Sequence, residues 1–95
     1  MSHMDVDLPL DDVEIELIAS NPARNIRRRY GISASVDLFG AVIVETRWGR
    51  VGAAGQRKAR SFPHPLEADR YIRAILARRN TAESRLGAAY RIRNG

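Results

Sequence analysis

The feature that most constrains the fold is a change in the period of the apolar residues near residue 65. Before that point, apolar and polar residues alternate, which is the pattern of a β-strand that buries one face. After it, apolar residues fall three or four positions apart, which is the spacing of an amphipathic helix. The alternating segments are 13–19, 26–36, 41–48 and 56–62, and the helical stripe comprises Ala68, Tyr71, Ile72, Ile75 and Leu76.

Turn and helix-end signals separate these segments. Pro22 lies in a turn after the first strand, and the sequence DLFG at residues 37–40 is a candidate hairpin turn. Pro65 suits the first position of the helix, and Asn80 can end it. A last short strand is expected at 88–93. This order predicts an α+β fold, a mostly antiparallel β-sheet with one amphipathic helix packed on one face.

The length of 95 residues predicts a single domain. We expect residues 1–4, MSHM, to be an expression remnant and residues 5–12 to form an acidic flexible arm, which leaves 13–95 for the domain. The absence of cysteine excludes disulfides and thiolate metal sites. No apolar run approaches the roughly 20 residues that a membrane helix needs, and no signal peptide is visible, so we expect a cytoplasmic protein.

The positive charge is concentrated in the body of the chain. The net charge is +5, but residues 17–95 hold all sixteen Lys and Arg against five Asp and Glu, a net charge of +11. A body this basic is typical of a protein that binds a polyanion. The alternative is that GC-rich coding supplied the arginines and that they only keep the surface soluble.

An enzymatic site is hard to find in the sequence. His64 lies between two prolines, and no histidine pattern has the spacing of a metal site. The segment GRVGAAG at 49–55 spaces its glycines unlike nucleotide-binding loops and precedes no helix, so we expect it to form a tight turn. The sequence therefore predicts a non-enzymatic protein without a cofactor or metal.

Trp48, the only tryptophan, lies within the segment TRWGRVGAAGQRKAR at 46–60. It admits two interpretations, a core residue at the end of a strand or a platform on which a base or sugar stacks. Clustered like charges repel each other and are tolerated more readily where an anion binds, so cationic neighbours favour the platform. Those neighbours are Arg47 and Arg50 beside it and, across an expected hairpin, Arg57, Lys58 and Arg60.

The same segment resembles the signature of the WGR domain family. RWGRVGAAGQ carries the Trp-Gly-Arg core, a hydrophobic residue, Gly and a downstream Gly-Gln that ends at Gln56. RRRYGISASVDLFG is similar to the strand and turn that precede the signature in bacterial members, and SFPHPLEADRYIRAILARR is similar to the segment that opens the helix. The resemblance extends from about Asn25 to Tyr90 and implies a mostly antiparallel sheet with one helix.

In DNA-dependent poly(ADP-ribose) polymerases the WGR domain holds a DNA break, and the resemblance implies roles for the matching residues. Trp48 would pack against the sugar of a terminal nucleotide, and Arg50 takes the place of the signature arginine that helps connect DNA to neighbouring domains. Arg27 and Arg28 would approach the terminal phosphate. This sequence holds no catalytic domain, so we do not expect the connecting role here.

The C-terminal segment departs from the family pattern. Members usually have a basic stretch that ends in Gly-Tyr or a related Lys-Thr pattern. Here the sequence reads NTAESRLGAAY, with two alanines between Gly87 and Tyr90. The contacts that this end makes in relatives are therefore not expected to carry over.

Taken together, residues and resemblance predict a small nucleic-acid-binding module that prefers DNA ends or strand breaks. The alternative is a protein-interaction module that docks an acidic partner on the same basic ridge; competition by short DNA would separate the two. The residues expected to bind are Trp48 as the stacking platform with Arg27, Arg28, Arg47, Arg50, Gln56, Arg57, Lys58 and Arg60 around it.

The acidic N-terminal segment generates the first testable prediction. Residues 1–16 hold six Asp or Glu and no Lys or Arg, so this segment can compete with nucleic acid for the basic body. Deletion of residues 1–12 should tighten DNA binding at low salt, measured by fluorescence anisotropy of a labelled duplex. Unchanged affinity would show that the segment is an ordinary solvated tail.

Overall fold

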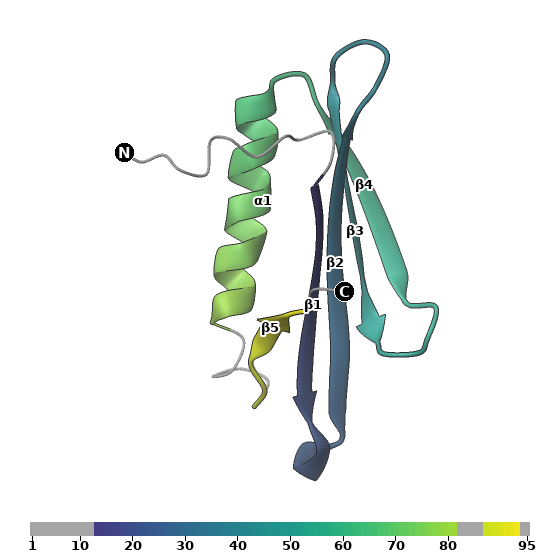
Figure 1. Ribbon diagram of the computed structural model, residues 1–95, viewed down its shortest axis with the longest axis vertical. Coiled ribbons are helices and arrows are strands. Elements are labelled where there is room, and N and C mark those ends of the chain that lie inside the picture. Colours follow the sequence, from purple (N-terminus) through teal and green to yellow (C-terminus); the bar gives the residue numbers. More distant parts are fainter. Residues whose placement is uncertain (1–12, 82–86, 94–95) are drawn as a thin grey trace.

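The computed structural model describes residues 13–81 and 87–93; the remnant expected at 1–4 and the acidic arm expected at 5–12 lie outside these ranges. Figure 1 shows the arrangement of the elements along and beside one sheet. In chain order they are β1 (Val13–Asn21), the 3-10 helix η3 (Pro22–Arg24), β2 (Ile26–Val36), β3 (Val42–Arg50), β4 (Gln56–Phe62), α1 (Pro65–Asn80) and β5 (Tyr90–Ile92).

The sheet has the strand order β4-β3-β2-β1-β5, and every neighbouring pair is antiparallel. Three successive hairpins build β1 to β4, as the turn signals predict. The helix α1 then leads from β4 at one edge to β5 at the other and packs on one face (Figure 1). The α+β fold predicted from the sequence is confirmed.

The turn between β2 and β3 fixes the register in which these two strands pair. The carboxylate oxygen Oδ1 of Asp37 accepts hydrogen bonds from the backbone N–H groups of Phe39 and Ala41, each at 2.9 Å. Asp side chains favour such turns because they satisfy backbone donors locally. The resulting register pairs Val36 with Val42, Tyr30 with Trp48 and Arg28 with Arg50.

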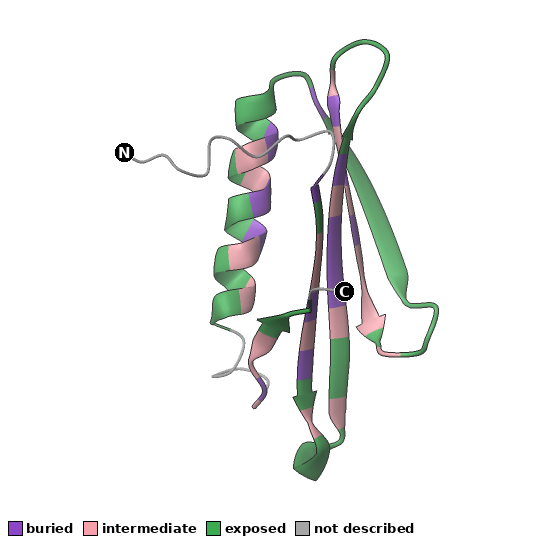
Figure 2. Cartoon of the chain, in the orientation of Figure 1, coloured by how far each residue is buried: buried purple, intermediate pink, exposed green. Residues whose placement is uncertain are grey.

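The core lies between α1 and the face of the sheet that it covers, and Figure 2 shows the buried segments of α1 on the side of the helix nearest the sheet. Pro65 is the first residue of α1, as predicted, and its fixed φ suits that position. The predicted apolar stripe is confirmed, since Ala68, Ile72 and Ile75 are buried and the other two members pack against them.

The helix covers only part of the strand beneath it. Sixteen residues of α-helix span about 24 Å, whereas the eleven residues of β2 span about 36 Å. Alternation along β2 places Arg28 and Val36 on the same face as the buried Ile32, which would bury both, but this expectation is wrong at both ends: Arg28 is exposed and Val36 is 45% exposed. The buried part of that face is Tyr30, Ile32 and Ala34.

The burial pattern predicts which strand positions determine stability. Ile32 is fully buried at the centre of the core, so Ile32→Ala should lower the free energy of unfolding by about 2–5 kcal/mol. Ser35, on the same strand, is exposed, and Ser35→Ala should change it by no more than about 0.5 kcal/mol. Urea titrations of the two variants would measure this difference, and equal midpoints would contradict the position of the core.

Candidate functional site

A groove of about 860 Å³ lies at the end of the sheet that the helix leaves uncovered. Its walls come from β2, β3 and η3, with contributions from α1, β4 and β5. Among the described residues, fifteen line the groove; seven of these are Lys or Arg, and none is Asp or Glu. A concave surface with one sign of charge concentrates counter-ions, so this groove favours anionic ligands.

Two aromatic rings form one wall of the groove. The β2–β3 register places Tyr30 directly opposite Trp48, and their ring centroids lie 6.1 Å apart with an interplanar angle of 19°. Trp48 is half-buried and packs against the core while it lines the groove. Trp48 therefore contacts both the core and the groove, and its role as a stacking platform stays a prediction.

The last turn of α1 supplies a cation above this wall. The guanidinium carbon of Arg79 lies 4.0 Å from the ring centroid of Tyr30 and 5.9 Å from that of Tyr90. Such cation–π contacts hold a guanidinium without neutralising its charge. The Nε atom of Arg79 is buried and has no hydrogen-bond partner among the described residues.

Arg50 is fixed by neutral partners. Its Nη1 donates to the backbone oxygen of Asn25 at 3.2 Å, and its Nη2 donates to Oδ1 of the same residue at 3.0 Å. Asn25 has a φ of 56°, a left-handed conformation that asparagine tolerates better than most residues. These bonds tie the end of β3 to the turn after η3, and within 13–81 and 87–93 no carboxylate forms an ion pair with Arg50.

The turn between β3 and β4 is built by glycines and held by an arginine. A Cβ atom on Gly49 would lie 2.8 Å from the Cα atom of Gly55, so the two strands approach too closely for side chains. Nη2 of Arg29 donates to the carbonyl oxygens of Ala53 and Ala54 at 2.6 and 3.1 Å. The segment expected to form a tight turn does so, and it brings the chain back beside Trp48.

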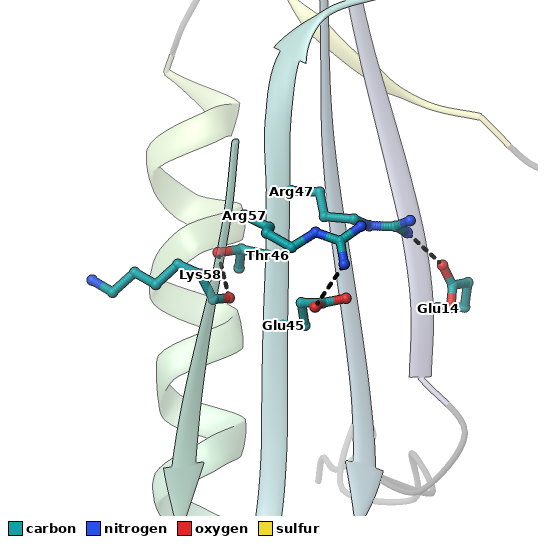
Figure 3. A network of polar contacts seen from close by, with 6 residues as sticks. All are labelled: Glu14, Glu45, Thr46, Arg47, Arg57 and Lys58. Atoms are coloured by element: carbon teal, nitrogen blue, oxygen red, sulfur yellow. Dashed lines mark hydrogen bonds and ion pairs between the residues drawn. The ribbon is translucent and has the colours of Figure 1, made fainter. Parts of the chain in front are cut away.

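Two of the predicted cations lie on the other face of the sheet. Arg47 and Arg57 pair with each other in the register, and each has an acidic neighbour, as Figure 3 shows. Nη2 of Arg47 lies 3.2 Å from a carboxylate oxygen of Glu14, and Nη1 of Arg57 lies 3.7 Å from one of Glu45. Lys58 points the opposite way from Arg57, because successive strand residues alternate between faces (Figure 3).

The structure thus divides the nine predicted site residues. Those that line the groove are Arg27, Arg28, Trp48, Arg50 and Lys58. Those that do not are Arg47, Gln56, Arg57 and Arg60. Gln56 lies opposite Trp48 in the register but is exposed, and Arg60 is used elsewhere, with its guanidinium 5.3 Å from the Phe62 ring and 5.1 Å from the Tyr71 ring.

Sequence reasoning missed part of the groove. Tyr30 could have been found, because a turn at DLFG implies its pairing with Trp48. Arg79 carries no such signal, since its position depends on how far the helix extends over the sheet. The lining residues that were not predicted include Asn25, Tyr30, Tyr71, Arg79 and Tyr90, together with Arg24 from η3.

The chemistry available in the groove is that of binding. Within 13–81 and 87–93 there is no group of three His, Cys, Asp or Glu that could hold a metal ion. No helix in this part of the chain is long and apolar enough to cross a membrane. What the groove offers is hydrogen-bond donors with positive charge beside flat aromatic rings.

Comparison with known proteins identifies related sequences. The model of the WGR domain family matches residues 14–86, which includes Trp48 and begins earlier than the resemblance at Asn25 suggested. An uncharacterized protein, y4dW of Sinorhizobium fredii (strain NBRC 101917 / NGR234), is 34% identical over 56 residues, which is 59% of this chain. The match covers 28% of that relative, so the chain spans little more than a quarter of its length.

The geometry of the β3–β4 turn predicts unequal effects of two glycine substitutions. Gly52 and Gly55 both have positive φ, 88° and 70°, so alanine at either should cost about 1–2 kcal/mol of stability. At Gly52 the added Cβ meets nothing within 4 Å, whereas at Gly55 it clashes with the carbonyl oxygen of Trp48. Gly55→Ala should therefore cost about 1–3 kcal/mol more.

Urea unfolding followed by Trp48 fluorescence would measure both effects. The emission of the folded Gly55→Ala variant should also shift, because the backbone of Trp48 must move. Equal unfolding midpoints for the two variants would show that the close approach of Gly55 to Trp48 is not rigid.

Proposed function

The chain belongs to the WGR domain family, and from this premise we propose that it binds DNA at strand ends or breaks through the groove. WGR domains are generally nucleic-acid-binding modules, and no catalytic family is indicated. The observation that carries the proposal is the composition of the groove, because its described lining combines aromatic rings with seven cations and includes no acidic residue.

The aromatic wall supports recognition of a nucleotide. Base or sugar rings stack on aromatic side chains, and each stacked base contributes about 1–3 kcal/mol. Trp48 is already stacked on Tyr30, so it is held in place before a ligand arrives. A prearranged ring loses little side-chain entropy on binding, which favours affinity.

The cations supply contacts to phosphate. Arg28 and Lys58 line the groove, and neither has an ion-pair partner among the described residues. Arg50 is oriented by Asn25 but keeps its charge. Guanidinium groups match phosphate oxygens in geometry and form charge-assisted hydrogen bonds with them, so these side chains suit a phosphodiester or a terminal phosphate.

The position of the aromatic rings favours an end over continuous duplex. Bases inside a duplex are covered by their neighbours on both faces. A ring recessed in a groove can therefore stack only on a terminal or unstacked nucleotide. An acidic protein segment, the alternative partner, would use the cations but would leave the aromatic wall without a matching flat surface.

The sole tryptophan provides a direct test. Titration with a short blunt or nicked duplex carrying 5′-phosphates should quench Trp48 fluorescence at micromolar DNA, and the effect should weaken as salt is raised. A duplex of the same sequence closed by loops at both ends is the control for end recognition. Equal quenching by both duplexes would contradict recognition of ends, and no binding of either would contradict the proposal as a whole.

Variants separate the platform from general charge. Trp48→Leu keeps an apolar contact with the core but removes the ring, so it should weaken binding by about 1–3 kcal/mol, roughly 5- to 150-fold. Arg28→Ala should weaken binding without affecting the core, because Arg28 is exposed. Arg70→Ala, on the exposed side of α1, removes the same charge outside the groove and is the matched control.

Anisotropy of a labelled 5′-phosphorylated duplex would give the affinities, and urea titrations would show that each variant is folded. If the Trp48→Leu variant is unfolded, the comparison of DNA affinity between Arg28→Ala and Arg70→Ala still tests whether the groove is the binding site. Equal affinities of these two arginine variants would contradict the assignment of the groove as the binding site.

A further inference from the structure

A second hollow, of about 390 Å³, lies by the helix-free face of the sheet. Eight residues of the described part of the chain line it; three of them are arginines, Arg27, Arg91 and Arg93, and none is acidic. Ile18 and Ile92 are also in its lining, and Ile92 is 65% exposed. Neither Arg91 nor Arg93 is predicted as a site residue by the sequence pattern.

The two hollows meet at one strand pair. The pairing of β2 with β3 ends at Arg28, and the pairing of β1 with β5 ends at Ala19. The strands β1 and β2 continue to pair with each other as far as Asn21 and Ile26. The end of the β1–β2 hairpin, residues 20–27, therefore projects beyond its neighbours, as Figure 1 shows at the lower end of the sheet. We call this segment the hairpin arm. Arg27, which belongs to it, lines both hollows.

The surface arginines differ in whether an acid compensates them. Arg47, Arg57 and Arg73 each lie within 4 Å of a carboxylate. The guanidinium groups of Arg27, Arg91 and Arg93 are exposed and have no hydrogen bond or ion pair within 13–81 and 87–93. Uncompensated charges of one sign in a hollow repel each other, and an anion in the hollow would relieve that repulsion.

The lining of the second hollow matches a sugar–phosphate backbone better than a small anion. Its arginines suit phosphate oxygens, and its isoleucines suit the apolar edges of the sugars. It contains no aromatic ring on which a base could stack. These features point to contacts that depend on charge and length rather than on a terminal nucleotide.

We propose that the second hollow holds the sugar–phosphate backbone of the same nucleic acid whose end lies in the groove, with the ligand passing around the hairpin arm at Arg27. This inference rests on the proposed function of the groove. It makes the binding surface larger than the groove and gives it two parts, one for the end and one for the adjoining backbone.

The test compares two probes and two double variants. The short probe is a stem-loop with one phosphorylated end, and the long probe has the same end with a stem extended by about 10 base pairs, one helical turn. Arg91→Ala/Arg93→Ala removes two charges from the second hollow and leaves backbone pairing of β5 intact. Arg57→Ala/Arg70→Ala removes two exposed arginines that line neither hollow and is the matched control.

The wild-type protein should bind the long probe more tightly and with a steeper salt dependence than the short one. Arg91→Ala/Arg93→Ala should abolish this difference and lower the slope of log affinity against log salt by about 2, since each phosphate contact contributes about 0.9. Its affinity for the short probe should match that of the control.

Two outcomes would overturn the inference. They are equal affinity of the wild-type protein for both probes, and equal loss of affinity for the long probe in both double variants. Under either outcome, the groove would still be the proposed site for a DNA end, provided that the short probe binds and Trp48→Leu lowers the affinity for this probe. Failure of the wild-type protein to bind either probe would refute the proposed function together with the inference.

Discussion

The helix is shorter than the strand it covers, and the candidate site depends on that mismatch. Where α1 lies over β2 the sheet is buried, and where the helix ends the same face of the sheet becomes the floor of a groove. The boundary is formed by Arg79 over the ring of Tyr30, with Trp48 stacked beside it. The core and the groove therefore share one aromatic wall, and the packing that stabilises the domain also holds the rings that a ligand would contact.

Within the described part of the chain, the arginines in the middle of the sheet have acidic neighbours, whereas those around the hairpin arm do not. Around the middle of the sheet, arginines lie beside carboxylates, as Arg47 does beside Glu14 and Arg57 beside Glu45. Around the hairpin arm, the cations contact neutral groups, aromatic rings or solvent, and no carboxylate of residues 13–81 and 87–93 lines either hollow. Folding energy alone would favour an even distribution, because uncompensated like charges repel. The uneven distribution is the physical basis for assigning anion binding to one end of the domain.

The fold followed closely from local patterns, but the site did so only in part. Alternation, turn chemistry and the helical stripe determine the elements, and the Asp37 turn determines which residues of β2 and β3 face each other. The alternation also implies that Arg47 and Arg57 leave the face that carries Trp48. Local patterns do not predict how far the helix extends over the sheet. That packing decides that Arg28 is exposed, and it places Arg79 in the groove.

The turn after β2 has a consequence at the other end of the strand. A shift of the β2–β3 pairing by one residue would exchange the two faces of β3, so Glu45 and Arg47 would replace Val44 and Trp48 beneath the helix. Asp37 lies far from the groove along the sheet, yet the turn that its two hydrogen bonds stabilise sets the register that places Tyr30 opposite Trp48. If the groove binds as proposed, a change in this loop would alter ligand recognition without altering any residue that lines the groove.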